Sequence, residues 1–400
     1  MGEIKKKSRK RRNRQIRLVV TLAVAVVILA ALIIAIAVWN PNDSLFDTGN
    51  ASVENEVEST EEGQSEINEN DIEDNTFTMF FTGDVMLENS MGRYDEQGIN
   101  GILSEYLENE MVSADMTVIN NEFPFSARGV KAEDKQFTFR VHPRYVSALQ
   151  DMGVDVASLA NNHALDFGPE ALSDSFVTLE EAGIPYVGAG ETKERAEEAI
   201  YVEAGGRTVG VLSASRVIPV HTWNITSSQP GLFCTYDSTR LVERIKEIED
   251  ECDFVVVFVH WGIEREAFPE EYQRELAHQY INAGADLVVG NHAHVPQGIE
   301  YYKEVPIVYC LGNYIFNPNM VDTYALKVEW ATDGTTQLQV IPIGTSDLLT
   351  SELTGQDKQD FYDYLESISA GIEIDDDGKV LYLSDNMIAG KTSTDEGVME

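Results

Sequence analysis

The chain has 400 residues, 43% of them hydrophobic, and a formal net charge of −39 from 68 Asp or Glu against 29 Lys or Arg. Nine of the basic residues fall within the first 17, so residues 18–400 carry 20 basic against 67 acidic groups. An acidic surface of this kind repels phosphate backbones, which argues against nucleic acid as a partner. It also repels a polyanionic substrate, except where a metal ion or a local Arg cluster reverses the field.

Residues 18–39 contain no charged side chain. A helix of this length extends about 33 Å, which is enough to cross a bilayer. We therefore predict a basic cytoplasmic segment at 1–17 and one transmembrane helix at 18–39, and the positive-inside rule then makes the main domain extracellular. A cleaved signal peptide is the alternative, because Ala35-Ile36-Ala37 resembles a weak cleavage site.

The next segment, residues 40–76, is rich in Glu, Asp, Asn and Ser and contains no Lys or Arg. It shows no apolar period of a helix or a strand, and its like charges repel one another. We predict an acidic, disordered linker that tethers the main domain to the membrane.

Residues 77–345 alternate strand-like and helix-like segments, which predicts a layered α/β domain with some parallel pairing. Predicted strands cover 78–82, 116–120, 154–159, 184–187, 208–213, 254–259, 287–289 and 307–311. Predicted helices cover 143–152, 169–182, 238–251 and 269–283, several opened by Pro and closed by Gly. Runs at 324–332 and 336–343 flank Asp333-Gly334 and predict a hairpin. Residues 346–400 form a C-terminal extension with one predicted helix near 359–368 and an acidic tail.

Side chains that can bind a metal follow five of these strands. In chain order they are Asp84, Glu122, Asn162 with His163, His260, and His292 with His294. Ligands of open α/β sheets gather at the carboxyl ends of the strands, so these side chains are expected to meet. Carboxylates, an amide and imidazoles together suit one or two divalent ions, with Mn, Fe or Zn as the candidates.

Each residue alone also has a structural explanation, because a carboxylate or Asn at a strand end often caps the following helix or turn. The occurrence of all these residues at strand ends of one chain favours a metal site. Three further residues stay ambiguous. Arg140 either clamps an anionic oxygen or forms a surface ion pair, Asp166 either orients His163 or caps the helix at 169, and Glu264 is equally open.

Five sequence blocks stand out along the domain. They are Gly83-Asp84-Val85-Met86-Leu87, Asn121-Glu122-Phe123-Pro124, residues 158–168, His260-Trp261-Gly262 and residues 311–316. These blocks resemble the signature blocks of the CapA family, capsule-synthesis proteins associated with poly-gamma-glutamate. That family is in turn similar to calcineurin-like metallophosphoesterases. The resemblance therefore implies a two-sheet sandwich flanked by helices (αββα) and a dinuclear metal site.

The resemblance also implies roles for the residues that match. Glu122 stands where a bridging carboxylate would be, and His163 matches a residue that protonates a leaving group. The implied reaction is phosphoester hydrolysis by a metal-bound hydroxide. The implied partners are an anionic cell-envelope polymer or a phosphoester substrate, together with capsule synthase subunits. The implied metal ligands are Asp84, Glu122, Asn162, His260, His292 and His294.

The chain departs from these patterns at three positions. Met86 stands where phosphoesterases usually have a His ligand, which leaves one metal position short of a ligand. Asn291 and Ala293 stand where the CapA family often has His and Pro, which puts their support of the neighbouring ligands in doubt. Two functions therefore stay open, a membrane-anchored metal-dependent hydrolase and a non-catalytic accessory subunit of a capsule polymer machine.

Overall fold

The computed structural model describes residues 76–383 except 134, 226–228 and 319. The predicted cytoplasmic segment, the predicted transmembrane helix, the linker up to residue 75 and the end of the tail lie outside these residues. Among the helices that are described, none combines the length and apolar character needed to cross a membrane.

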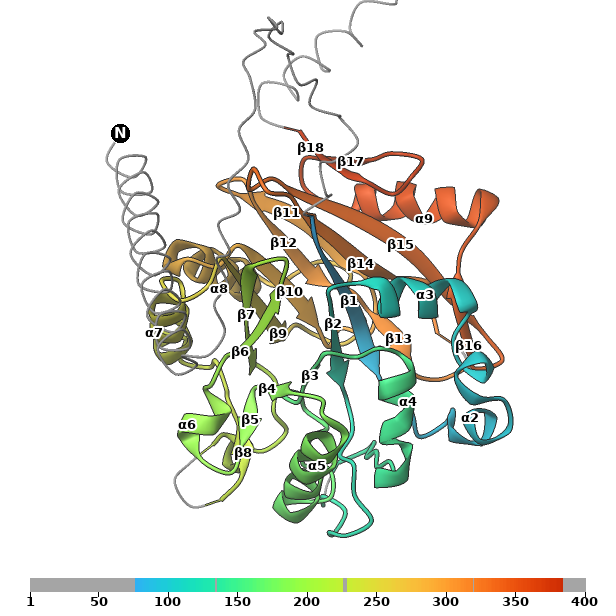
Figure 1. Ribbon diagram of the computed structural model, residues 1–400, viewed down its shortest axis with the longest axis vertical. Helices are drawn as coiled ribbons and strands as arrows, with labels where there is room; N and C mark the ends of the chain where they lie inside the picture. Colours follow the sequence, from blue (N-terminus) through green and yellow to red (C-terminus); the bar gives the residue numbers. More distant parts are fainter. Residues whose placement is uncertain (1–75, 134, 226–228, 319, 384–400) are drawn as a thin grey trace, which may run out of the picture. The chain divides into compact units, whose positions relative to one another are not determined.

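The first of two large sheets has the strand order β16-β15-β14-β1-β2-β3-β4, with β13 paired to the end of β1 (Figure 1). Strands β1 to β4 and β13 run parallel to one another, whereas β14 pairs antiparallel with β1, and β15 and β16 continue the sheet as antiparallel strands. The strands are β1 (Phe77–Val85), β2 (Met116–Asn121), β3 (Val156–Ser158), β4 (Tyr186–Val187), β13 (Asn313–Ile315), β14 (Thr323–Trp330), β15 (Thr336–Ser346) and β16 (Leu349–Glu352).

The second sheet has the order β11-β12-β10-β9-β7-β6. Its four inner strands are parallel and its two edge strands are antiparallel to their neighbours. The strands are β6 (Ile200–Ala204), β7 (Arg207–Ser215), β9 (Phe254–His260), β10 (Leu287–Asn291), β11 (Gln297–Tyr302) and β12 (Val305–Cys310). Two small ribbons pair β5 (Ala189–Gly190) with β8 (Gly231–Leu232) and β17 (Ile372–Ile374) with β18 (Val380–Tyr382).

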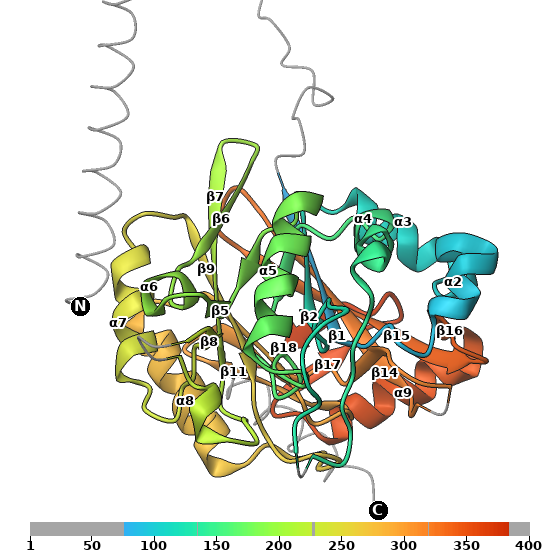
Figure 2. The same cartoon turned by 90° about the horizontal axis from the view of Figure 1, so that it is seen from below.

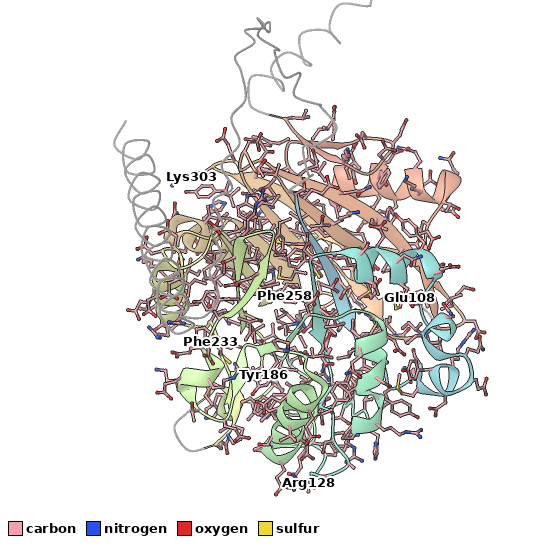
Figure 3. All side chains as sticks on the ribbon, viewed as in Figure 1. Glu108, Arg128, Tyr186, Phe233, Phe258 and Lys303 are labelled. Carbon is pink, nitrogen blue, oxygen red and sulfur yellow. The ribbon has the colours of Figure 1, made fainter. Side chains whose placement is uncertain are left out.

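The two sheets pack face to face, and strand β9 shows why. Its sequence is apolar throughout because both of its faces are buried. Alternate residues from Phe254 to Phe258 belong to the apolar cluster between the sheets, and those from Val255 to Val259 belong to a cluster under helices. Phe258, labelled in Figure 3, stacks on Phe81 of the opposite sheet with 6.2 Å between ring centroids.

Helices cover the outer faces of both sheets (Figures 1 and 2). Helices α7 (Thr239–Ile248) and α8 (Glu271–Ala283) pack on the second sheet. The first sheet is covered by α2 (Met91–Gln97), α3 (Glu105–Ser113), α4 (Val146–Asp151) and α5 (Pro169–Ala182). Helix α9 (Gly355–Ser367) adds apolar side chains to the cluster between the sheets, and α6 is Lys193–Ala196. The predicted mixed α/β fold is confirmed.

Several predicted boundaries need correction. The strand expected at 154–159 is only Val156–Ser158, and the helix expected at 143–152 divides into a 3-10 turn and α4. Helix α8 begins after Pro269, because Glu270 and Gln273 form a capping box there. Helices α2 and α3 and strands β6 and β11 were not predicted. The predicted domain end at 345 falls inside β15, and β16 continues the same sheet.

The close approach of β1 and β13 predicts a strict requirement for glycine at position 83. A Cβ atom there would lie 1.8 Å from the carbonyl oxygen of Gly312. Gly83→Ala should therefore lower the free energy of unfolding by about 1–3 kcal/mol, as overpacking does. Gly92→Ala in α2 is the matched control, because a Cβ there meets nothing within 4 Å. Equal urea midpoints for the two variants would refute this account of the contact.

Candidate metal centre

The parallel strands of both sheets carry their polar residues to one shared edge. Asp84 lies beside Asn120 across β1 and β2, and His260 lies beside Asn291 across β9 and β10. The chain then turns sharply after β10, where His292 and His294 adopt positive φ angles of 100° and 58°. Such angles are uncommon for residues other than glycine and cluster at functional sites.

Two carboxylates lie fully buried at the centre of this edge. Asp84 and Glu122 both have 0% exposure. The Asn120 side-chain amide donates to both, at 2.7 Å to Asp84 Oδ1 and 3.3 Å to Glu122 Oε2. Burial and the neighbouring Asp84 carboxylate raise the pKa of Glu122 well above its ordinary value. The Glu122 carboxylate therefore needs positive charge close by to remain ionised.

The His294 imidazole lies close to both carboxylates. Its Nδ1 atom lies 3.0 Å from Asp84 Oδ2 and 2.8 Å from Asn313 Oδ1, and its Nε2 atom lies 3.9 Å from Glu122 Oε1. Burial disfavours the cation, but Glu122 and Asp84 together raise the pKa of His294 to about 10. In the absence of a metal ion, the His294 imidazolium is the cation that lies beside both carboxylates.

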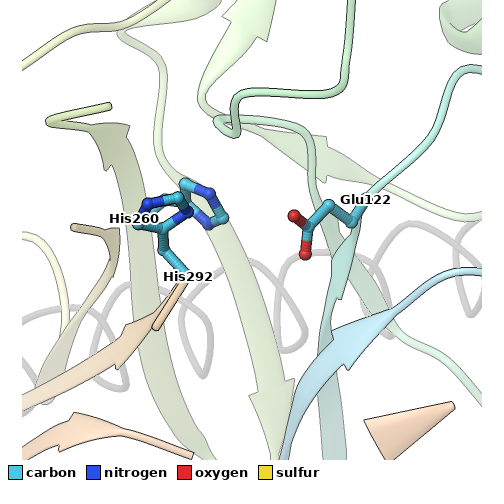
Figure 4. Close-up of side chains that lie close together, drawn as sticks. All are labelled: Glu122, His260 and His292. Carbon is cyan, nitrogen blue, oxygen red and sulfur yellow. The ribbon is translucent and has the colours of Figure 1, made fainter. Parts of the chain in front are cut away.

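His260 and His292 form the opposite side of the site, with 4.6 Å between their ring centroids. His260 Nε2 lies 3.0 Å from Asn162 Oδ1. Burial and the nearby His294 lower the pKa of His292 to about 3. Burial, followed by the neighbouring His292, also lowers the pKa of His260 well below its ordinary value. Both rings are therefore neutral, which is the form that binds metal. Figure 4 shows the two rings facing the Glu122 carboxylate.

The described residues form three groups that could hold a metal ion, and in each group the donor atoms lie within 4.8 Å of one another. Glu122 belongs to two of them, Glu122–His260–His292 and Asp84–Glu122–His294, and the third is Glu264–His292–His294. Glu122 Oε1 and His292 Nδ1 are buried without a hydrogen-bond partner among the described residues. Unpaired buried polar atoms are rare, so these residues fit a divalent ion chemically.

His163 lies at the edge of these groups. Its Nδ1 atom is 2.7 Å from Asp166 Oδ2, and its Nε2 atom is 3.8 Å from Glu122 Oε1. The ring of Phe139 packs on it with 4.5 Å between centroids. Burial lowers the pKa of His163 below its ordinary value, and the hydrogen bond to Asp166 offsets only part of this effect. Asp166 therefore orients the ring so that Nε2 faces the candidate ligands.

Lys135 is a site residue that the sequence did not reveal. Its ammonium group donates to Asn162 O at 2.5 Å, lies 2.9 Å from His163 Nδ1 and forms an ion pair with the buried Asp166. The residue occurs in a polar loop without periodicity, so no pattern marked it. Asn120 was also missed, although an amide at the end of an otherwise buried apolar strand is a signal that could have identified it.

The weaker candidates are placed differently. Glu264 is exposed, yet its carboxylate lies within reach of His292 and His294. Arg140 packs its guanidinium on the Phe167 ring at 4.0 Å and donates to the carbonyl of Arg128, and no described contact joins it to the ligand groups.

Met86 is buried in the apolar cluster on the outer face of the first sheet. The second group therefore gains no ligand from this position.

The Lys135–Asp166 pair predicts a strong effect of charge removal. Lys135→Met leaves the Asp166 carboxylate buried without its cation and should cost about 3 kcal/mol of unfolding free energy. Lys131→Met in the same loop is the matched control, because Lys131 is exposed and forms no described ion pair. The double variant Lys135→Met/Asp166→Asn should recover most of the loss in urea unfolding. Additive losses would contradict the pairing.

Two solved structures align with the chain at low similarity. A hypothetical protein from Thermus thermophilus aligns with a TM-score of 0.38 and 18% identity, covering 69% of this chain and 100% of that one. The NAD nucleotidase of Haemophilus influenzae aligns with a TM-score of 0.32 and 15% identity, covering 64% of this chain and 53% of that one.

Sequence relatives are closer. The PGA biosynthesis protein CapA of Bacillus subtilis is 31% identical over 68% of this chain and 72% of its own. The capsule biosynthesis protein CapA of Bacillus anthracis is 30% identical over 68% of each chain. A probable polyglutamine synthesis accessory protein of Mycobacterium tuberculosis is 27% identical over 70% of this chain and 78% of its own. The family described as bacterial capsule synthesis protein PGA_cap matches residues 78–318. The predicted CapA resemblance is confirmed, and the chain belongs to this capsule synthesis family.

Proposed function

We propose that the chain is a membrane-anchored, extracellular, metal-dependent hydrolase of the phosphoesterase type that acts in the synthesis or export of a poly-gamma-glutamate-like capsule polymer. The observation that carries the proposal is Glu122, which is shared by two adjacent ligand groups while His163 Nε2 lies 3.8 Å from it. Shared carboxylate ligation with a positioned imidazole is the arrangement that two-metal hydrolysis uses.

The residues have distinct roles in this proposal. Asp84, Glu122, Asn162, His260, His292 and His294 would hold one or two ions of Mn, Fe or Zn. A bound divalent ion supplies Lewis acidity and lowers the pKa of water at neutral pH. His163 then donates a proton from Nε2 to the leaving oxygen, and Asp166 holds the ring through Nδ1. Lys135 fixes the loop that carries both Asn162 and His163.

The charge of the site supports an anionic substrate in spite of the acidic surface. The Bacillus anthracis relative is named as a capsule biosynthesis protein, and the proposed poly-gamma-glutamate-like polymer or a phosphoester precursor would be anionic. Bound metal ions and Lys135 would reverse the local field at the strand edge. Arg140 and Glu264 flank this region as lesser candidates for substrate contact.

A non-catalytic accessory role is the second candidate, and Met86 is the observation that favours it. Its side chain lies in an apolar cluster, so the Asp84–Glu122–His294 group has three described ligands. A metal centre without a ligand at position 86 could serve binding or stability within a complex with capsule synthase subunits. The mycobacterial relative is named as an accessory protein, which fits this alternative.

Hydrolysis by the full-length chain in detergent separates the two roles. We expect Mn²⁺-dependent cleavage of phosphomonoester or phosphodiester test substrates. His163→Asn should lower kcat about 100-fold or more with metal content unchanged, because it removes only the proton donor. His292→Ala should lose bound metal and activity together. His221→Asn is the control, because His221 is exposed at the start of a short 3-10 helix, His221–Trp223, and belongs to none of the ligand groups. Bound metal without turnover of any substrate would favour the accessory role.

The proposed topology predicts that a protease added to intact cells degrades the main domain. The basic residues within 1–17 should keep the N-terminus inside, so a tag at residue 1 should survive while one at residue 400 is lost. Complete protection of the main domain in intact cells, with cleavage after lysis, would refute this orientation.

A further inference from the structure

Asn291 is a buried amide that the proposed mechanism does not use. Its side chain is 1% exposed, and neither Oδ1 nor Nδ2 has a hydrogen-bond partner among the described residues. Buried side-chain amides are nearly always paired, because an unpaired donor or acceptor loses its hydration without compensation. An amide with both ends unpaired therefore indicates a missing partner.

The alternation of β10 shows where this amide points. Leu287 and Val289 belong to the apolar cluster between the sheets, whereas Val288 belongs to the cluster under the helices. Asn291 continues the first set, so its side chain faces the space between the sheets. It pairs in register with His260, whose side chain faces the same way. Neighbouring strands lie about 4.8 Å apart, which places the amide beside that imidazole.

The neighbours of Asn291 on this face leave its amide unsatisfied. Asn120 on the opposite sheet already directs its amide nitrogen to Asp84 and Glu122 and accepts from Asn161 at its oxygen. On β12, the register that pairs Val289 with Val308 continues toward Cys310, a buried free thiol. A thiol is only a weak donor. The missing partner is therefore not a described side chain.

We propose that Asn291 belongs to the metal centre, where its Oδ1 atom supplies a further oxygen ligand to the ion held by Glu122, His260 and His292. The inference rests on the proposed function, because it requires the ion. An amide oxygen is an accepted ligand for Mn²⁺-type ions, and Asn162 presents the same group on the other side of His260. Coordination of the ion by Oδ1 would give this buried, unpaired acceptor a partner.

Two substitutions with opposite expected effects test the proposal in the full-length chain. Asn291→Leu has a similar shape and no polar atoms, so it should raise the melting temperature of the metal-free protein by a few degrees. The same variant should weaken Mn²⁺ binding at least about tenfold in calorimetry. Asn291→Asp keeps an oxygen ligand, so it should retain Mn²⁺ binding while lowering the melting temperature of the metal-free protein.

The outcomes separate this inference from the proposed hydrolase. If Asn291→Leu binds Mn²⁺ as tightly as the unmodified chain, the amide binds only water and the inference is wrong, whatever the hydrolytic activity. If Asn291→Leu destabilises the metal-free protein, the amide has a protein partner and the inference is also wrong. If the unmodified chain binds no Mn²⁺, the metal centre and the inference fail together. The expected binding pattern without turnover supports the inference and contradicts only the hydrolase.

Discussion

Two carboxylates buried side by side constrain the whole structure. Asp84 and Glu122 have no exposure to water, and desolvation of a charge is costly unless an opposite charge lies close by. The protein offers His294 as a cation beside both carboxylates. The neutral rings of His260 and His292 complete a set of side chains that could hold a divalent ion.

The arrangement of the two sheets holds these carboxylates and imidazoles together. Parallel strands in two stacked sheets bring their carboxyl ends to one edge, so residues from β1, β2, β9 and β10 meet although they lie far apart in sequence. Apolar clusters on both sides of each sheet hold the strands rigidly. The loops add further polar side chains to the site, because Lys135 and His163 come from the segments that follow β2 and β3.

The sequence revealed the strand ends because buried parallel strands are long apolar runs, and a polar residue that ends such a run is conspicuous. Asp84, Glu122, His260 and His292 were found in this way, and the structure brings them together. Lys135 could not be found, because its role depends on how a loop without periodicity folds back over another loop.

Short strands and helices without a clear apolar period were also difficult to predict from the sequence. Strand β3 has three residues and β6 pairs at an edge, so tertiary contacts decide their extent more than local preference does. The sequence showed that Met86 departs from the phosphoesterase pattern, but only the structure shows that its side chain packs in an apolar cluster. The Asp84–Glu122–His294 group therefore receives no ligand from position 86.

Anomalous diffraction from crystals of the protein grown with Mn²⁺ tests the central claim most directly. The account predicts a strong peak within coordination distance of Glu122, His260 and His292, and a weaker peak near Asp84, Glu122 and His294. A chain that shows no peak beside Glu122, or that binds Mn²⁺ only at other residues, would contradict the metal centre.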